Sequence, residues 1–211
     1  MTQSQTSPHE AKVAVSDFPV HELIARRWSP RAYANQPVEA EKLRQLFEAA
    51  RWSASSGNGQ PWSFLIATQD DRAAFDKMVA ALIEGNVAWA SRAPILGIVV
   101  AEKIRPNGRS NRVAFYDVGM AMQNLLLQAT ELGLSLRQMG GFSPDKAREL
   151  FQIPPEHEAV VMFALGYAGD PDQLADNHRS QEWAARERKP LSEFVFAGKW
   201  GDTAPLVTDE G

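Results

Sequence analysis

Cationic side chains offer the clearest chemistry in this sequence, which has 15 arginines against 7 lysines. The planar guanidinium fork of arginine matches the geometry of a phosphate group. Two clusters lie far apart in the chain, namely Arg26-Arg27 with Arg31, and Arg186-Glu187-Arg188-Lys189. Composition alone explains the first as a charge-complemented helix end and the second as a solvated face. The alternative is a phosphate held between the two ends of the chain.

Two glycine-containing segments could approach a ligand closely. Residues 53–60 contain three serines and two glycines together with Asn58 and Gln60, so exposed N–H groups and amides precede an expected strand. Such a loop can recognise the edge of a planar heterocycle. The segment Gln138-Met139-Gly140-Gly141-Phe142 has adjacent glycines, which permit close approach of the backbone. Composition alone favours an ordinary helix-to-strand connection for the first segment, and the alternative for the second is a tight turn after a strand.

Several common sites are absent from the sequence. It has no G-x-S-x-G, no phosphate loop ending in Gly-Lys-Ser/Thr and no G-x-G-x-x-G. It has no cysteine, which excludes disulfides, thiolate nucleophiles and cysteine-ligated clusters. None of the four histidines has a metal-ligand neighbour of the usual kind at i+3 or i+4, and Ala175 occupies the position where a calcium loop over 170–178 needs glycine. We therefore expect no metal site.

Charge and hydropathy restrict the partners and the location. The net charge of −4 gives no general attraction to nucleic acid. The longest apolar run, residues 93–101, is too short to span a bilayer, and the polar start has no apolar signal segment. We expect a cytoplasmic protein with no nucleic-acid or membrane partner.

The hydrophobic pattern predicts one domain over residues 16–200, between a disordered tail at 1–15 and a C-terminal tail at 201–211. Expected helices cover residues 16–27, 43–52, 71–83, 113–132 and 144–151, the last with Ser143 as N-cap, and a short segment covers 86–90. Expected strands cover residues 62–68, 95–101, 134–139 and 159–165. Residues 113–132 are apolar on nearly every face, which indicates a central buried helix. The aromatic residues Phe194, Phe196 and Trp200 must dock on something.

Five motifs follow one another in a fixed order along the chain. They are Arg27-Trp28-Ser29-Pro30-Arg31-Ala32-Tyr33, Ser53-Ala54-Ser55-Ser56-Gly57-Asn58-Gly59-Gln60-Pro61-Trp62, Asn86, Met139-Gly140-Gly141-Phe142 and Arg186-Glu187-Arg188-Lys189-Pro190. In this order they resemble the FMN-dependent nitroreductase family of NAD(P)H-dependent flavin oxidoreductases. The similarity runs from about residue 21 to residue 200, and the serine-rich second motif is its most specific part.

The resemblance implies a fold and an assembly. The expected fold is of the α+β class, with three α/β/α layers around a mainly antiparallel central sheet. The expected assembly is an intertwined homodimer with two FMN sites at the subunit interface. The buried helix over 113–132 would then lie at that interface.

The resemblance also implies roles for individual residues. Arg27, Ser29, Arg186 and Arg188 would contact the phosphate and ribityl chain of FMN, and Arg31 would lie beside flavin N1 and O2. Ring-edge and ribityl contacts would come from Ser55, Ser56, Asn58 and Asn86. Backbone N–H groups near flavin N5 would come from the segment Gln138, Met139, Gly140 and Gly141. Trp28 of the first motif would also contact the cofactor, at a position where smaller or imidazole side chains are frequent in the family.

The implied reaction takes a hydride from NADH or NADPH onto FMN and passes electrons to a small-molecule acceptor such as a nitroaromatic or a quinone. The cycle would be ping-pong, with no side chain acting as a covalent catalyst. Other members of the family are dehydrogenases, dehalogenases or azoline oxidases, so those reactions remain open. A non-catalytic FMN-binding module is the alternative from a different class.

Overall fold

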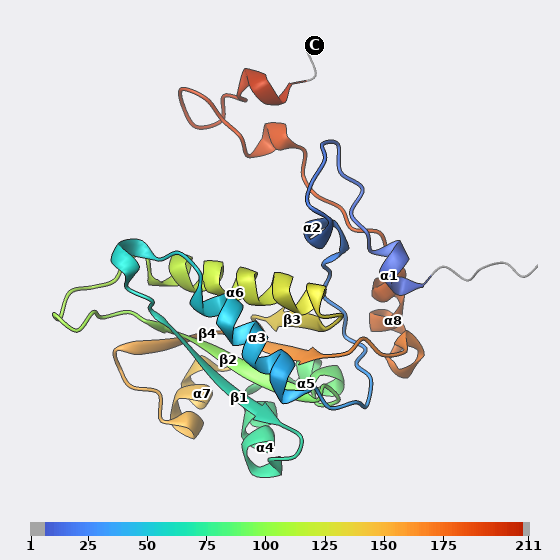
Figure 1. The fold of residues 1–211 in the computed structure, drawn as a ribbon, viewed down its shortest axis with the longest axis vertical. Helices are drawn as coiled ribbons and strands as arrows, with labels where there is room; N and C mark the ends of the chain where they lie inside the picture. Colours follow the sequence, from blue (N-terminus) through green and yellow to red (C-terminus); the bar gives the residue numbers. More distant parts are fainter. Residues whose placement is uncertain (1–6, 209–211) are drawn as a thin grey trace, which may run out of the picture.

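The computed structural model describes residues 7–208, and their core is a four-stranded antiparallel sheet (Figure 1). The strands lie in the order β1-β2-β4-β3, with bounds β1 Trp62–Thr68, β2 Ile95–Glu102, β3 Ser135–Met139 and β4 His157–Gly166. Each pair of neighbours is antiparallel. The edge strand β3 lies beside the first arginine motif, because Arg137 Nη1 donates to the carbonyl oxygen of Ser29.

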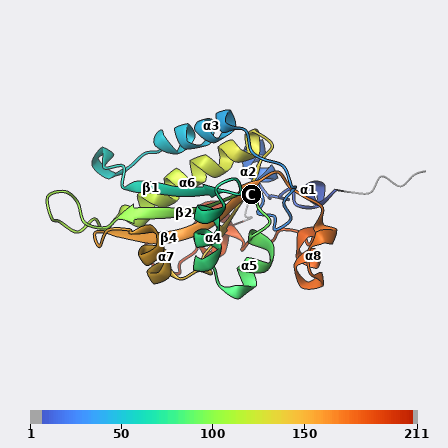
Figure 2. The same cartoon turned by 90° about the horizontal axis from the view of Figure 1, so that it is seen from below.

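Helices cover both faces of the sheet (Figure 2). One face carries α3 (Ala40–Arg51) and α6 (Ala114–Glu131), and the other carries α4 (Arg72–Ala81), α5 (Glu84–Ala90) and α7 (Pro144–Phe151). Side chains of β2 alternate between two cores, as the period of a strand requires. Ile95 and Val99 pack with α3 and α6, whereas Leu96 and Ile98 pack on the other side. The expected three-layer α+β fold is confirmed.

The helix α6 has two different faces. Eight of its 18 residues are buried, and it ends before Gly133, whose φ of 72° suits a C-terminal cap. On the outer side, Phe115 and Tyr116 are 44% and 69% exposed. The predicted buried central helix is therefore confirmed on one face, while Phe115 and Tyr116 lie exposed outside that face.

The N-terminal region is more ordered than its composition indicates. A short helix α1 (Pro8–Ala11) lies inside the expected tail, and residues 1–6 fall outside the described range. Ser7 and Glu10 form a reciprocal capping box, with distances of 3.3 Å from Glu10 N to Ser7 Oγ and 2.7 Å from Ser7 N to Glu10 Oε2. The helix expected from residue 16 begins later, as α2 (Glu22–Arg26) with His21 as N-cap. The expectation of a disordered segment is thus wrong for residues 8–11.

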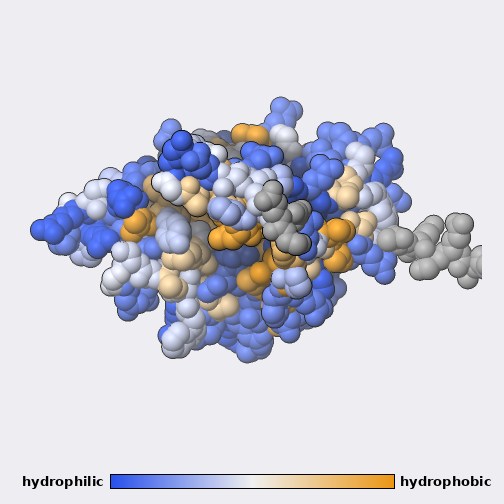
Figure 3. All heavy atoms as spheres, turned by 90° about the horizontal axis from the view of Figure 1, so that it is seen from above, coloured by the Kyte–Doolittle hydropathy of each residue, from blue (hydrophilic) through white to orange (hydrophobic). Residues whose placement is uncertain are grey.

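The C-terminal region forms an extended arm, residues 190–208, that leaves the sheet domain (Figure 1). It follows α8 (Asp176–Trp183), a helix that the sequence pattern does not reveal, and it contains short 3-10 turns at Leu191–Glu193 and Pro205–Val207. The second turn lies in the expected tail. Phe194 and Trp200 are 56% and 91% exposed. Among residues 7–208 these two aromatic side chains therefore do not show the expected docking. Figure 3 shows patches of apolar side chains on the face that carries the arm.

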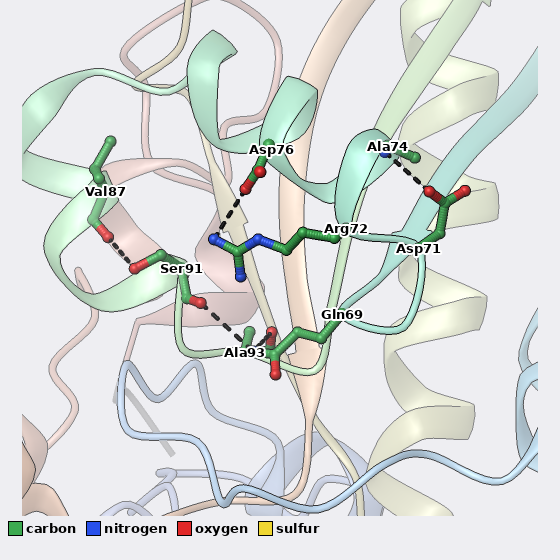
Figure 4. A network of polar contacts seen from close by, with 8 residues as sticks. All are labelled: Gln69, Asp71, Arg72, Ala74, Asp76, Val87, Ser91 and Ala93. Carbon is green, nitrogen blue, oxygen red and sulfur yellow. Dashed lines mark hydrogen bonds and ion pairs between the residues drawn. The ribbon is translucent and has the colours of Figure 1, made fainter.

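A polar network fixes α5 relative to the strands on either side (Figure 4). Gln69 Nε2, after β1, donates to the carbonyl oxygen of Ala93 at 3.0 Å, just before β2. Ser91 Oγ donates to the carbonyl oxygen of Val87 at 2.8 Å, which closes the last turn of α5. The network holds the helix that carries Asn86 in a defined place.

The N-cap of α7 gives a stability prediction. Ser143 Oγ accepts a hydrogen bond from Lys146 N at 3.2 Å, as the sequence predicts, and Pro144 follows it. We expect Ser143→Ala to lower the free energy of unfolding by about 1 kcal/mol, because a helix N–H loses its acceptor. Urea denaturation followed by circular dichroism measures the change. Ser143→Asp keeps an acceptor and should lose less, and equal losses in the two variants would contradict the capping explanation.

Candidate functional site

A cationic cavity of about 300 Å³ lies where the two ends of the domain meet. We call it the cation pocket, and its walls are formed by Lys12, Arg27, Trp28, Ser29, Arg31, Arg137, Gln181, Glu182, Arg186 and Arg188. Six of these side chains are cations and only one is a carboxylate. The structure therefore brings together the two arginine clusters that the sequence places about 150 residues apart.

Arg27 is the cation most affected by this crowding. Burial, followed by the nearby charges of Arg186 and Arg188, lowers the pKa of Arg27 to about 10. Its Nη1 donates to Ser29 Oγ at 3.0 Å, which fixes the guanidinium at the pocket wall. Arg188 is exposed, and its Nη1 donates to the backbone oxygen of Glu187 at 2.6 Å. These groups repel one another unless an anion lies among them.

Arg186 has a donor that the protein does not use. Its Nη1 donates to the carbonyl oxygens of Ala25 and Lys12, at 2.7 and 3.1 Å. Its Nε atom is buried and has no hydrogen-bond partner among residues 7–208. A buried donor without an acceptor is costly, so it indicates an acceptor supplied from outside the chain. An unused donor within a cluster of arginines fits the phosphate of FMN.

A buried carboxylate holds the backbone of the first motif. Glu182 is 1% exposed, and its two oxygens accept from Arg31 N at 3.1 and 3.2 Å. The guanidinium carbons of Arg31 and Arg137 lie 6.0 and 5.5 Å from the ring centroid of Trp89 on α5. Such cation–π contacts hold a guanidinium in place while leaving its N–H groups free to donate. The side chain of Arg31 is therefore oriented before any ligand binds.

Four residues of the pocket were not predicted from the sequence, namely Lys12, Arg137, Gln181 and Glu182. Arg137 directly precedes the glycine motif, and Glu182 stands four residues before Arg186, so proximity to a motif was a usable signal for both. Lys12 carried no such signal, because it falls in a segment without visible period. Only the packing of α1 brings it to the pocket.

The glycine motif packs against Asn86. Asn86 Nδ2 donates to the carbonyl oxygen of Gly141 at 2.9 Å. A Cβ atom on Gly141 would lie 2.6 Å from Ile83 Cδ1 and 2.7 Å from Asn86 Nδ2, so a larger residue would displace the ends of these two side chains. A Cβ atom on Gly140 would meet nothing within 4 Å, which leaves its outer side open to a ligand. In the same segment Met139 is buried and Gln138 is exposed.

The serine-rich loop adopts an unusual backbone. Gly57, Asn58 and Gln60 have φ values of 60°, 52° and 48°, in the left-handed region. Ser55 Oγ accepts from Gln60 N at 3.0 Å, which closes the loop on itself. Ser56 N donates at 3.2 Å to Asp117 Oδ2, a buried carboxylate in the first turn of α6. The loop is thus anchored at the start of α6.

The cation pocket lies toward the opposite end of the same helix. Arg27 and Trp28 line a neighbouring cavity of about 230 Å³ together with Thr130 and Gly133, at the end of α6. Asp117 and Thr130 are 13 positions apart, a rise of about 20 Å along an α-helix. Within one protomer the structure therefore does not bring Ser55, Ser56 and Asn58 to the other expected site residues.

The fold and the pocket define a class of protein: a three-layer α+β domain with an antiparallel sheet and a cationic cluster built from both ends of the chain. The chain belongs to the nitroreductase family, whose model matches residues 24–167. That range includes the first four motifs and leaves out α1, α8 and the second arginine cluster.

Comparisons with individual proteins agree with the family. A protein of Xanthomonas oryzae pv. oryzae named "Putative NADH dehydrogenase/NAD(P)H nitroreductase" is 31% identical over 172 residues, which are 72% of this chain and 86% of that protein. A crystal structure of an oxidoreductase containing FMN is 31% identical with a TM-score of 0.84, and the match covers 96% of this chain and all of that one. A nitroreductase family protein of Clostridium difficile 630 is 28% identical with a TM-score of 0.65, over 84% of this chain and 96% of its own.

Residues 7–208 contain neither a membrane-spanning helix nor a cluster of metal-ligating side chains. None of the helices there combines the length and the apolar character that a membrane crossing needs. The same residues contain no group of three or more histidine, aspartate or glutamate side chains able to hold a metal ion.

Proposed function

We propose that this protein is an FMN-dependent oxidoreductase that uses NADH or NADPH to reduce a small-molecule acceptor, such as a nitroaromatic or a quinone, in a ping-pong cycle. The observation that carries the proposal is the convergence of Arg27, Arg186 and Arg188 in one pocket, with a buried donor of Arg186 left unused. Membership of the nitroreductase family and the likeness to an oxidoreductase containing FMN support it.

The phosphate of FMN would be held by the pocket cations. Arg27, Arg186 and Arg188 supply the charge, and Ser29 Oγ, which already accepts from Arg27, can donate its own proton to a phosphate oxygen. A guanidinium gives two parallel N–H donors to one phosphate, which favours a fixed orientation. Arg186 would gain the acceptor that its buried Nε lacks.

The flavin ring would lie along Arg31 and the open side of Gly140. When bound, FMN supplies the acceptor of the hydride and the donor of electrons. Arg31 supplies a fixed positive charge beside the ring, and its orientation is maintained by Trp89 and by Glu182. Gly140 leaves the backbone accessible without a side chain over the ring face. Asn86 keeps the glycine motif in place through Gly141.

The assembly would be a homodimer in which each site uses both subunits. The loop with Ser55, Ser56 and Asn58 is bonded to Asp117, about 20 Å along α6 from Thr130, which lines the cavity next to the cation pocket. The exposed outer face of α6 and the exposed arm offer the apolar area that a stable interface needs. A second copy would therefore bring its serine-rich loop to the first copy's pocket. Light scattering should give a dimer at micromolar concentration, and a stable monomer loaded with FMN would refute this assembly.

Anaerobic reduction distinguishes the enzyme from a binding module. We expect the purified protein to bind one non-covalent FMN per chain, released by heat or acid, and NADH or NADPH to bleach its yellow colour within seconds. Bound FMN that neither nucleotide reduces would indicate a storage or sensing module. If the protein cannot be reconstituted with FMN, the proposed function is wrong. Reoxidation of the reduced flavin by nitroaromatics, quinones or halogenated aromatics, and reduction of the oxidised flavin by azolines, then separate the reactions of the family.

A further inference from the structure

The segment formed by residues 7–14, which contains α1, is tied to the end of α8. The Lys12 side chain is buried, with the residue 8% exposed, and its Nζ donates to the carbonyl oxygens of Gln181 and Ala184 at 2.6 and 2.5 Å. Further along, Ala14 N donates at 2.9 Å to the carbonyl oxygen of Ala25, at the end of α2. The segment therefore joins the two regions that carry the arginine clusters.

Trp28 provides the surface on which α1 rests. Its Nε1 donates to His9 Nδ1 at 3.0 Å, and the two rings meet edge to face with centroids 5.5 Å apart. Lys12 Nζ lies 5.6 Å from the centroid of the same indole. The Trp28 side chain, expected to contact the cofactor, is thus engaged by α1. The matched family region begins at residue 24, so His9 and Lys12 lie outside it.

Lys12 also holds Arg186 directly. The carbonyl oxygen of Lys12 accepts from Arg186 Nη1 at 3.1 Å, while the carbonyl oxygen of Ala25 accepts at 2.7 Å from the same nitrogen. Lys12 therefore makes two kinds of contact. Its amine donates to the end of α8, and its backbone carbonyl accepts from the guanidinium of Arg186. Loss of these contacts would free Arg186 to adopt other rotamers.

The charged groups around Lys12 connect the docking of residues 7–14 with the binding of an anion in the pocket. Burial lowers the pKa of the Lys12 amine, Glu182 raises it, and Arg137, Arg186 and Arg31 lower it further. A buried ammonium beside three guanidiniums and one carboxylate is stabilised when a dianion enters the same pocket. Binding of the anion and docking of the segment should therefore favour each other.

We propose that Lys12 is a positioning residue of the phosphate subsite, and that residues 7–14 form a strap whose docking is coupled to phosphate binding. The inference rests on the proposed function, because the phosphate is that of FMN. By linkage, the strap raises the affinity for FMN by the same factor by which FMN stabilises the docked strap. Riboflavin, which has no phosphate, should be insensitive to the strap.

The test titrates FMN and riboflavin into full-length apo-protein and follows quenching of flavin fluorescence. We expect Lys12→Met, which keeps the apolar stem and removes the donor, to weaken FMN binding roughly 5- to 10-fold. Riboflavin binding should change less than about 2-fold, on the same ground that it lacks the phosphate. Lys12→Arg should recover part of the loss, since it restores a charged donor. The matched control is Lys146→Met, an exposed lysine on α7 that should change neither affinity.

A second measurement does not depend on how the variant folds. Hydrogen–deuterium exchange of the wild-type protein should show stronger protection of the amides of residues 7–14 with FMN than with riboflavin. Equal protection by both ligands, or equal loss of both affinities in Lys12→Met, would overturn the coupling. If the wild-type protein binds neither flavin, the proposed function itself fails. If Lys12→Met binds FMN and the ratio of its FMN affinity to its riboflavin affinity equals that of the wild type, the strap proposal is wrong while the proposed function stands.

Discussion

Replacing Arg27 or Arg188 with alanine is expected to weaken FMN binding by about 10- to 150-fold and to leave riboflavin binding almost unchanged. A hydrogen bond to a charged group contributes roughly 1.5–3 kcal/mol, which gives this range of affinities. Arg27 and Arg188 line the same pocket, and their mutual repulsion is relieved only when an anion lies between them. Riboflavin lacks the phosphate, so it offers these cations no partner.

Titration of both ligands into each apo-protein by fluorescence quenching measures the effect. The matched control is Arg44→Ala, which removes an exposed arginine of α3 that pairs with Glu41 at 3.1 Å. It should leave both affinities at the wild-type value. If Arg27→Ala and Arg188→Ala lower the riboflavin affinity as much as the FMN affinity, the two cations do not bind the phosphate. They would then be a helix-end charge and a surface charge, as their composition alone also allows.

Arg31→Ala is expected to slow reduction of the bound flavin by NADH or NADPH about 100-fold. A preorganised donor aimed at developing charge contributes on this scale when the site excludes water. The Arg31 guanidinium lies over Trp89, and its backbone N–H is held by the buried Glu182, so the charge is in place before reaction. Reduction places negative charge on the flavin ring, and without this cation the ring should be harder to reduce.

Anaerobic stopped-flow absorbance at saturating nucleotide gives the rate, and a spectroelectrochemical titration gives the midpoint potential. Both FMN and riboflavin should bind more weakly to Arg31→Ala, because the residue is assigned to the ring and not to the phosphate. Arg31→Lys keeps the charge and should retain a higher potential than the alanine variant. An unchanged potential in Arg31→Ala would remove the residue from the ring site.

Local sequence patterns predicted most elements of the sheet domain. The strand at Trp62–Thr68 has the expected bounds, as does the helix Pro144–Phe151 with Ser143 as its N-cap. Strands β2, β3 and β4 differ from prediction by one or two residues at their ends. These elements combine regular apolar periodicity with Gly, Pro or capping residues at their boundaries, so the local signal is sufficient.

Short elements at both ends of the chain were missed for a physical reason. The helices α1 and α8 have four and eight residues and carry no apolar period. Helices of this length are not stable on their own, so their stability must come from tertiary contacts. For α1 those contacts are the bonds of Lys12 to the end of α8 and of His9 to Trp28. Neither partner is a neighbour in sequence.

The sequence by itself determined the element types, the order of the motifs and, through their resemblance, the family to which the chain belongs. Tertiary structure decided which motifs meet in one protomer. It joined Arg27 to Arg186 and Arg188 and placed Asn86 against Gly141, but it left the loop of Ser55 to Asn58 at the far end of α6. Local periodicity reports which face of an element is buried, whereas the distance between two elements depends on how those faces pack.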